Sequence, residues 1–437
     1  MDLEKEYRQK VITAEEGAAL VKEGDVLELG FAAIFPVHFD EALAARKDDF
    51  CHVVIRNGIL SNPSKLLEAG EPFEWQSWHA TPDVRRAIER GTANHIPIRY
   101  SEMPRYIREN VTTDILVLPV SEMDEHGYFN FGLDSSHFLD QARMAKTVVV
   151  EVNPRQPRVA GRSESEIHLR DVDFIIETEG YPVAALPIRS YTEVDEKIAA
   201  FVVERIKDGS TLQLGIGALP GAVGDAIASS SLKNLGVHTE MYVDSFMDMT
   251  LAGKITGAMK RRDKGRQVFA FIEGSEKLYR FADENPELMS APVDYVNDAR
   301  VIADQYRMVS INTALHVNLR GEVSSETVGL RHISGAGGQL DFALGSYLAP
   351  DGKGFICLHS SRVDKNGVRH SNIVPDFSAG TIVTMVAPVT QYVVTEYGVA
   401  NLKGKSTYER AKALIAIAHP ECREELIRGA KAKGVWR

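Results

Sequence analysis

The strongest constraint on the fold is an alternation, repeated along the chain, of short runs rich in β-branched residues and longer stretches with helical periodicity. Segments such as 113–120 (TDILVLPV) and 146–153 (KTVVVEVN) have the composition of buried strands. The segment 195–209 (DEKIAAFVVERIKDG) instead places four apolar side chains on one helical face, namely Ile198, Phe201, Val202 and Ile206. Strands that alternate with helices predict an α/β fold with mostly parallel sheets.

A weak internal repeat predicts that this fold has two related halves. The segment 20–31 (LVKEGDVLELGF) resembles 205–216 (RIKDGSTLQLGI), because each combines a helix end, a turn glycine and a strand that runs into a second glycine. A second match pairs 124–132 (DEHGYFNFG) with 318–329 (NLRGEVSSETVG) in the same order. Two matches at similar offsets favour duplication, although helix–glycine–strand is also a common local solution.

The stretch between the two halves has the character of a linker. Residues 179–195 (EGYPVAALPIRSYTEVD) contain two prolines and little periodicity. We therefore predict an N-terminal α/β domain over residues 1–187 and a C-terminal α/β domain over residues 188–437. The junction of two such halves is a natural place for a ligand.

A glycine-rich turn follows one of the predicted strands. In 212–228 (LQLGIGALPGAVGDAIA) a strand runs into Gly215 and Gly217, and Pro220 suits the first turn of the helix that follows. Glycines allow a ligand to approach the backbone closely, and free amides at a helix N-terminus bind anions. A tight strand–helix turn without a ligand is the alternative interpretation.

The same turn invites comparison with the GxGxxG loop of dinucleotide-binding folds, with Glu240 as the acid that binds the ribose. Pro220 occupies the position of the third glycine, however. The segment 236–249 (GVHTEMYVDSFMDM) also does not read as a clean second strand that ends in an acid. The sequence therefore gives little support to a dinucleotide site.

A second glycine-rich element lies in 331–345 (RHISGAGGQLDFALG), where three glycines fall within residues 335–338. Backbone amides left uncovered by side chains suit an oxyanion or a phosphate. A flexible connector is the alternative, but the flanking Ile333 and Phe342 favour a loop anchored in a core.

Glu240 lies near a predicted strand-to-helix junction, where side chains of α/β enzymes often face the ligand. A carboxylate can attack a thioester carbonyl to form a mixed anhydride, and the released thiolate can then form an enzyme thioester. Taken alone, one glutamate among 61 acidic residues is a weak signal, since carboxylates near helix N-termini usually interact only with the helix dipole. The GxSxG elbow of serine hydrolases does not occur in the sequence.

Composition excludes several classes of function. A net charge of −11 argues against nucleic acid or an anionic membrane as the main partner, without excluding a local site for a phosphorylated ligand. Three distant cysteines and no CxxC motif fit a reducing compartment and give no zinc signature. The charged start, MDLEKEYRQK, lacks the apolar region of a signal peptide, and no apolar run reaches membrane-spanning length. We therefore expect a cytoplasmic protein without a bound metal.

The motifs that carry a family resemblance follow one another along nearly the whole chain. They are IRYSEMPRY (98–106), DEHGYFNFG (124–132), VVVEVN (148–153), LQLGIGALPGAVG (212–224), GVHTEMYVDSFMD (236–248), ENPELMSAPVDYVND (284–298), ISGAGGQLDF (333–342), VTEYGVANLKG (394–404) and ALIAIAHP (413–420). Together they resemble the acetyl-CoA hydrolase/transferase family, and most closely its branch of butyryl-CoA:acetate and 4-hydroxybutyrate CoA-transferases.

The resemblance implies two open α/β domains of the type shared with ribose-5-phosphate isomerase and glucosamine-phosphate deaminase, with the active site at their junction. It implies that Glu240, in the motif HTEM, is the nucleophile of ping-pong transfer through a glutamyl-CoA thioester. The implied oxyanion and acyl site consists of Gly217, Ala218, Leu219 and Ser324. The implied CoA-binding loop consists of Gly335, Ala336, Gly337 and Gly338.

Two departures from the family pattern leave the details of the pocket open. The chain reads GALPGAV at 217–223, where similar sequences tend to read GGMPNAV or GGIPNAV, and some carry asparagine at the position of Ser324. The exact pocket shape and the acyl contacts are therefore not defined by the resemblance.

The resemblance further implies transfer of CoA between a short-chain acyl-CoA, with butyryl-CoA favoured, and acetate. The expected partners are acyl-CoA and short-chain carboxylates, with CoA as a substrate rather than a cofactor, and a second copy of the chain in a homodimer or homotetramer. Three alternatives remain: a 4-hydroxybutyrate CoA-transferase, an acyl-CoA hydrolase in which water resolves the same intermediate, and a non-catalytic CoA or nucleotide sensor.

Overall fold

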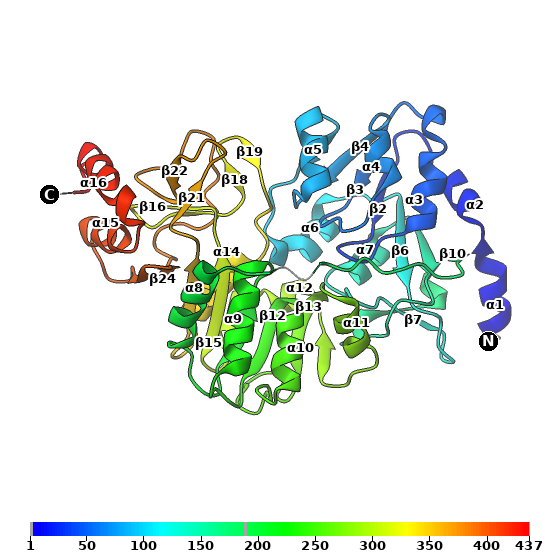
Figure 1. The fold of residues 1–437 in the computed structure, drawn as a ribbon. Coiled ribbons are helices and arrows are strands. Elements are labelled where there is room, and N and C mark those ends of the chain that lie inside the picture. Colours follow the sequence, from blue (N-terminus) through cyan, green and yellow to red (C-terminus); the bar gives the residue numbers. More distant parts are fainter. Residues whose placement is uncertain (1–2, 188–189, 437) are drawn as a thin grey trace. The chain divides into compact units, whose positions relative to one another are not determined.

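The computed structural model describes residues 3–187 and 190–436, which form two compact units (Figure 1). Unit 1 comprises residues 1–187 and 268–296, and unit 2 comprises residues 188–267 and 297–437. The segment 268–296 therefore groups with unit 1, although the predicted C-terminal domain of 188–437 includes it. Each unit is described by itself below.

Unit 1 is built on a parallel sheet, as the strand–helix alternation predicts. Every pair of neighbours in it is parallel. Its strands, in spatial order, are β1 (Val11–Ile12), β10 (Phe174–Glu177), β8 (Thr147–Val152), β6 (Ile115–Val120), β2 (Val26–Leu29), β3 (Val53–Arg56), β4 (Phe73–Ser77) and β5 (Ala93–His95). The central strand β6 is buried along its whole length, which explains why its sequence is continuously apolar.

Most helices of unit 1 precede or connect these strands, while α11 and α12 belong to the segment 268–296 (Figure 1). The helices are α1 (Leu3–Lys10), α2 (Ala14–Ala19), α3 (Val37–Ala44), α4 (Lys65–Ala69), α5 (Pro82–Arg90), α6 (Met103–Asn110), α7 (Phe138–Met144), α11 (Glu276–Ala282) and α12 (Val293–Val296). Shorter strands are β7 (Tyr128–Asn130), β9 (Glu166–His168) and β14 (Leu288–Ser290), and β13 (Gln267–Ile272) leads the chain out of unit 2. Thr13 caps α2 in a reciprocal box with Glu16, which defines where that helix begins.

Unit 2 has the same architecture. Hydrogen-bonded neighbours among its strands run in the order β12 (Gly236–Tyr242), β11 (Thr211–Leu214), β15 (Met308–Thr313), β20 (Lys353–Cys357), β24 (Tyr392–Thr395) and β25 (Gly398–Asn401). All of these pairs are parallel except β24 with β25. Small accessory ladders are formed by β16 (His316–Asn318), β17 (Val323–Ser324), β18 (Thr327–Val328), β19 (Arg331–His332), β21 (Ser361–Val363), β22 (Arg369–Ser371) and β23 (Ile373–Val374).

The helices of unit 2 include three that lie side by side along its sheet in Figure 1, namely α8 (Glu193–Val203), α9 (Ala218–Ser229) and α10 (Asp244–Leu251). The others are α13 (Ala299–Ala303), α14 (Gln339–Leu348), α15 (Thr407–Ala416) and α16 (Arg423–Ala432). The predicted apolar face of α8 is buried at Ile198 and Val202. Ile206 is also buried, but it lies beyond the end of the helix, because the chain there turns toward β11 through Gly209 at a φ of +75°.

Both matches of the internal repeat have the same local structure in the two units. Asp124 and Asn318 each accept two backbone amide hydrogen bonds through one side-chain oxygen, and a glycine follows each of them in the left-handed region. Gly127 has a φ of +85° and Gly321 a φ of +89°. A residue with a Cβ is strained in this conformation, so the turn selects glycine at both places.

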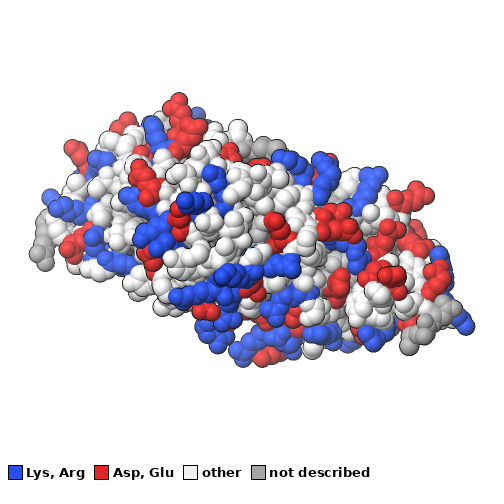
Figure 2. Space-filling model, turned by 90° about the horizontal axis from the view of Figure 1, so that it is seen from below, with Lys and Arg blue, Asp and Glu red and all other residues white. Residues whose placement is uncertain are grey.

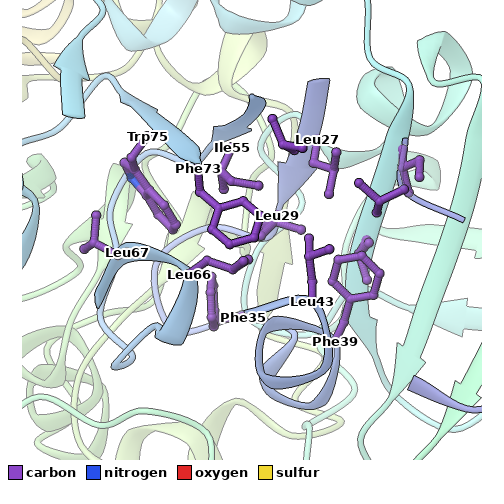
Figure 3. Packing of buried hydrophobic residues seen from close by; sticks show 14 of the residues in the cluster. Leu27, Leu29, Phe35, Phe39, Leu43, Ile55, Leu66, Leu67, Phe73 and Trp75 are labelled. Atoms are coloured by element: carbon purple, nitrogen blue, oxygen red, sulfur yellow. The ribbon is translucent and has the colours of Figure 1, made fainter. Parts of the chain in front are cut away.

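Charged side chains lie on the surface (Figure 2), while large apolar side chains form the core of each unit. In unit 1 one core cluster joins one face of the sheet to α3 and α4 (Figure 3). Its members include Leu27, Leu29, Phe39, Leu43, Ile55, Leu66, Phe73 and Trp75. Removal of this apolar area from water, at roughly 25 cal/mol per Å², is the main stabilising contribution.

Phe39→Ala is expected to destabilise unit 1 by about 3–5 kcal/mol, because its fully buried ring leaves a cavity when removed. Thermal unfolding monitored by circular dichroism would show a lowered midpoint. Leu330→Ala is the matched control, since that side chain is 86% exposed and its loss should shift stability by less than about 0.5 kcal/mol. An unchanged midpoint for Phe39→Ala would contradict the packing described here.

Candidate functional site

Glu240 lies in β12, close to the point where this strand ends and α10 begins. Residues 236–242 form the regular strand β12, which pairs in parallel with β11, although the segment 236–249 does not read as a clean strand in the sequence. The sequence hides this strand because polar residues occupy it: His238 and Thr239 are fully buried. Burial within the sheet, rather than local propensity, decides the conformation here.

Two donors hold the Glu240 carboxylate. The Nδ2 of Asn297 donates a hydrogen bond of 2.5 Å to Oε2, and the backbone amide of Gly338 donates another to the carboxylate. Gly338 is the N-cap residue of α14, so this amide belongs to the free donors at a helix N-terminus. No ion pair is made by Glu240 within residues 3–187 and 190–436.

Glycine is required in the loop that contacts this carboxylate. A Cβ on Gly338 would collide with both Oε2 of Glu240 and Nδ2 of Asn297. Gly337 has a φ of +52°, and a Cβ there would stand 3.5 Å from Oε1 of Glu240. The predicted loop 335–338 and Glu240 are therefore neighbours, and the glycines let the backbone approach the carboxylate directly.

Burial raises the pKa of Glu240 to about 7, and the nearby Asp341 carboxyl raises it further, while the hydrogen bonds from Asn297 and Gly338 oppose the shift. At neutral pH a substantial fraction of such a carboxyl group is ionised. It also loses little solvation when it attacks an electrophile. It is therefore matched to work as a nucleophile near pH 7.

The predicted glycine-rich turn lies beside this site at the neighbouring strand. It connects β11 to α9, and β11 pairs with β12. Gly217 is the N-cap residue of α9 with a φ of +113°, and Ala218 and Leu219 begin the helix. The first amides of a helix have no partner within it, so the start of α9 is a ready site for an anionic oxygen.

Ser324 makes no contact with Glu240 among the described residues. It lies in β17, is fully buried, and its hydroxyl donates a 3.0 Å hydrogen bond to the carbonyl of Thr327. Its hydroxyl is therefore engaged with the protein's own backbone.

A cavity of about 310 Å³ opens at the carboxyl ends of β15 and β20. Its lining is mostly apolar and includes Leu219, the third residue of the predicted oxyanion turn. Polar groups come from His316, His359 and Arg362. The carboxyl ends of parallel strands are where ligands bind in open α/β sheets.

Comparison with known proteins identifies the family. Residues 1–187 match the acetyl-CoA hydrolase/transferase N-terminal domain, and residues 274–430 match the acetyl-CoA hydrolase/transferase C-terminal domain. The chain belongs to the acetyl-CoA hydrolase/transferase family. The family resemblance predicted from the motifs is thereby confirmed.

Relatives and solved structures of similar length agree with this assignment. The chain is 46% identical to the butyryl-CoA:acetate CoA-transferase of Anaerostipes caccae, over 100% of this chain and 99% of that protein. It is 37% identical to the 4-hydroxybutyrate coenzyme A transferase of Clostridium kluyveri, over 99% of this chain and 100% of that protein. The crystal structure of RipA from Yersinia pestis superimposes with a TM-score of 0.92 at 34% identity, and the match covers both chains fully.

Other findings bear on cofactors and membranes. Among the described residues, no group of three or more His, Cys, Asp and Glu side chains is arranged to hold a metal ion. No helix in that part of the chain has the length and apolar character needed to cross a bilayer.

Sequence reasoning missed Asn297 as a member of the site. The residue lies 57 positions from Glu240 along the chain and inside the motif DYVND, where no local pattern distinguishes a buried donor from an ordinary turn residue. Asp341, within the QLDF part of another motif, was missed for the same reason. Only the fold, which places α13 and α14 against each other, brings these groups to one carboxylate.

Glu240→Gln is expected to stabilise the protein at pH 8 relative to the wild type. The pKa of Glu240 is about 7 in the folded protein and lies above the usual 4.5. Between pH 4.5 and pH 7 the carboxyl therefore ionises more readily in the unfolded chain than in the folded protein, and the stability of the wild type falls progressively over this range. This loss amounts to about 3 kcal/mol. Gln cannot ionise, so the variant escapes it.

Thermal midpoints of both proteins between pH 4 and pH 8 would test this. The gap between variant and wild type should be small at pH 4 and widen up to pH 7. Glu424→Gln is the control for the loss of one carboxyl at an exposed position in α16. A constant gap for Glu240→Gln would show that the carboxyl has an ordinary pKa.

Proposed function

We propose that this protein transfers CoA from a short-chain acyl-CoA, with butyryl-CoA as the preferred donor, to acetate, through a thioester between CoA and Glu240. The observation that supports this most directly is the partly buried Glu240 carboxylate, which is held by neutral donors and has a pKa of about 7. The 46% identity over the full length to a butyryl-CoA:acetate CoA-transferase supports the choice of substrates.

The first half-reaction consists of two acyl transfers. A carboxylate oxygen of Glu240 attacks the thioester carbonyl, the C–S bond breaks, and a mixed anhydride and the CoA thiolate are formed. The thiolate then attacks the Glu240 carbonyl of the anhydride, so that a glutamyl-CoA thioester forms and the free acid leaves as its carboxylate.

The second half-reaction runs the same steps with acetate. Acetate attacks the glutamyl thioester, the thiolate leaves, and it then attacks the acetyl carbonyl of the new anhydride. The products are acetyl-CoA and the regenerated Glu240 carboxylate. No net proton is taken up or released, and the exchanged thioesters are of similar energy, so no nucleotide hydrolysis is needed.

Negative charge develops on a carbonyl oxygen in each of these steps. We assign the stabilisation of this charge to backbone amides at the start of α9, from Gly217 to Leu219, and in the loop 335–338. The donor from Asn297 keeps one carboxylate oxygen fixed, which leaves the other as the attacking atom. Fixed donors of this kind lower the barrier because they need no reorganisation during the reaction.

The cavity of about 310 Å³ has the right position for the pantetheine arm of CoA. Strand spacing puts β15 at ~10 Å and β20 at ~14 Å from β12, which carries Glu240. From the sulfur of CoA to its gem-dimethyl carbon there are about ten bonds, or roughly 12 Å when extended. The apolar lining would receive the gem-dimethyl group, and Arg362 at the same cavity would face the pyrophosphate.

The covalent step is tested by mass spectrometry of the peptide that contains Glu240 after incubation with butyryl-CoA and reduction with borohydride. A glutamyl thioester is reduced to the alcohol, so a loss in mass at residue 240 is expected. Glu240→Ala should lower transfer by on the order of a thousandfold or more, with Glu424→Ala as the control of unchanged rate. An unmodified peptide from fully active protein would exclude Glu240 as the nucleophile.

An acyl-CoA hydrolase would use the same nucleophile, and acetate distinguishes the two outcomes. For a transferase, consumption of butyryl-CoA should depend on acetate and yield one acetyl-CoA for each butyryl-CoA. Release of free CoA at a rate that acetate does not change would identify a hydrolase. The same assay with 4-hydroxybutyryl-CoA would rank the two candidate donors.

Val328→Trp is expected to raise the KM for butyryl-CoA about tenfold, because the indole would fill part of the cavity at the assigned pantetheine position. The kcat should change far less, since Glu240 and its donors are not altered. Val363→Trp is the matched control: this valine is 55% exposed, lies in an accessory strand, and does not line the cavity. An equal KM for both variants would place CoA elsewhere.

A further inference from the structure

The amino-terminal edge of the sheet in unit 2 has a charge opposite to that of the chain as a whole. Five segments meet there, at 204–210, 230–235, 252–266, 304–307 and 350–353, and we call their surface the basic edge. They contain eleven lysines and arginines against five aspartates and glutamates, whereas the whole chain has 50 basic and 61 acidic residues. Figure 2, seen from the side of these loops, shows lysine and arginine side chains gathered there.

Contacts between the segments establish that they form one surface. Nζ of Lys254 donates to the carbonyl of Ser230 at 2.5 Å, and Nε of Arg262 donates to Asp304 at 2.7 Å. Nζ of Lys207 donates to Asp351 at 2.9 Å. Each contact joins two different segments, so the basic residues are neighbours in space although they are distant in sequence.

The loop 252–266 is held rigidly at the start of β12. The amides of Thr256 and Gly257 both donate to the carbonyl of Leu235. Lys260 points inward, is 3% exposed, and its Nζ donates at 2.7 Å to the carbonyls of Val237 and Arg266. This buried lysine fixes both sides of the loop, so the side chains that follow it are presented outward from a defined backbone.

Three cations of this loop are not neutralised. Within the described residues, the exposed side chains of Arg261, Lys264 and Arg266 make no ion pair and no side-chain hydrogen bond. Lys207 and Arg262 of the edge, by contrast, have carboxylate partners. Three like charges within six residues repel one another, and a structure that holds them together gains by binding an anionic surface.

Two large apolar side chains project beside these cations. Leu251, at the end of α10, is 63% exposed, and Met259, within the loop, is 46% exposed. Met259 packs with its stem against Gly209, which places it between two of the segments of the basic edge. Arginine and lysine interleaved with leucine and methionine is the composition of surfaces that lie in the headgroup region of a bilayer.

We propose that the basic edge binds the surface of an anionic lipid bilayer. Basic clusters of four to eight residues attract anionic lipids, and each basic residue near the surface contributes roughly a fivefold gain in partitioning. Leu251 and Met259 add apolar insertion, which a free phosphate cannot use. The negative net charge of the chain, which disfavours such a surface as the main partner, does not describe this edge.

Two other anionic partners fit the edge less well. Single-stranded nucleic acid binds through exposed aromatic side chains, and Tyr306, the one aromatic residue of the five segments, is half-buried and stacked under its neighbour Arg307. A second copy of the chain would meet the edge mainly through exposed ion pairs, which contribute little each, and a stable protein interface needs roughly 1,000 Å² or more.

Docking by this edge leaves the proposed reaction site open. Gly236 begins β12 beside the basic loop, and Glu240 lies near the other end of the same strand. The cavity at the carboxyl ends of β15 and β20 is likewise at the far edge of the sheet. Membrane binding and CoA transfer are therefore separable properties that are measured independently.

The test is co-sedimentation of the full-length protein with vesicles of equal parts phosphatidylglycerol and phosphatidylcholine, compared with vesicles of phosphatidylcholine alone. Binding to the anionic vesicles is expected, and it should weaken as salt rises. Arg261→Glu combined with Lys264→Glu and Arg266→Glu should lower binding on the order of a hundredfold. Leu251→Asp combined with Met259→Asp should lower it on its own.

The matched control is Lys365→Glu combined with Lys412→Glu and Arg428→Glu, which changes the net charge equally at exposed positions outside the basic edge. It should retain binding, and both triple variants should retain CoA transfer. Equal losses in the two triple variants, or no preference for the anionic vesicles, would overturn the proposal. Tighter binding to a polythymidine oligonucleotide than to the vesicles, or self-association abolished by the basic-edge variant alone, would overturn it in favour of those partners.

Discussion

Glu240 is partly buried beside two neutral donors, and within the described residues no lysine or arginine offsets its charge. A carboxylate paired with a cation has a low pKa and is a poor nucleophile, whereas a buried carboxylate without donors stays protonated. The pKa of Glu240 lies between these limits, because Asn297 and the amide of Gly338 stabilise the anion without cancelling its charge. The surrounding elements of unit 2 are arranged so that these two donors reach the carboxylate.

The parallel sheet meets that need through its connections. Each strand of β11, β15 and β12 runs in one direction, so the helices that follow or precede them bring their N-termini to one edge. The start of α9 and the start of α14 both lie there, one after the turn at Gly217 and the other after the loop 335–338. The start of α14 gives the Gly338 amide to Glu240, the start of α9 follows the neighbouring strand β11, and the cavity at the ends of β15 and β20 continues the same edge.

Much of this could be predicted from the sequence, and the limits have physical causes. The strands at 113–120 and 146–153 were predictable because parallel strands buried on both faces are mostly apolar. The strand that carries Glu240 has a weaker signal, since His238 and Thr239 are buried polar residues, and His238 meets Gln305 from another part of the fold. The three glycines within residues 335–338 indicated that the backbone approaches a ligand closely. Only the structure shows that Gly337 and Gly338 face the protein's own carboxylate, that of Glu240.

The first turns of the helix in 195–209 were predictable from its apolar face. Where the helix ends was not, because the end depends on the turn at Gly209. Asn297 could not have been found by any local pattern, because its role exists only where α13 lies against α14. Ser324 shows the opposite case: a resemblance predicted a role for its hydroxyl, and the hydroxyl is used in a backbone hydrogen bond. That role stays a prediction, and a bound acyl group would have to displace this hydrogen bond to engage the hydroxyl.

Net charge is a property of the whole chain, whereas binding depends on the field at one surface. Acidic residues outnumber basic ones in the sequence, yet the amino-terminal edge of the sheet in unit 2 reverses that ratio. The reversal follows from topology, because residues 204–210, 252–266 and 304–307 are separate loops that a parallel sheet brings to the same edge. The same rule that gathers helix N-termini around Glu240 at one edge thus gathers the connecting loops at the other. A parallel sheet has two chemically distinct edges, and in this unit one holds a partly buried carboxyl group between neutral donors while the other exposes cations to solvent.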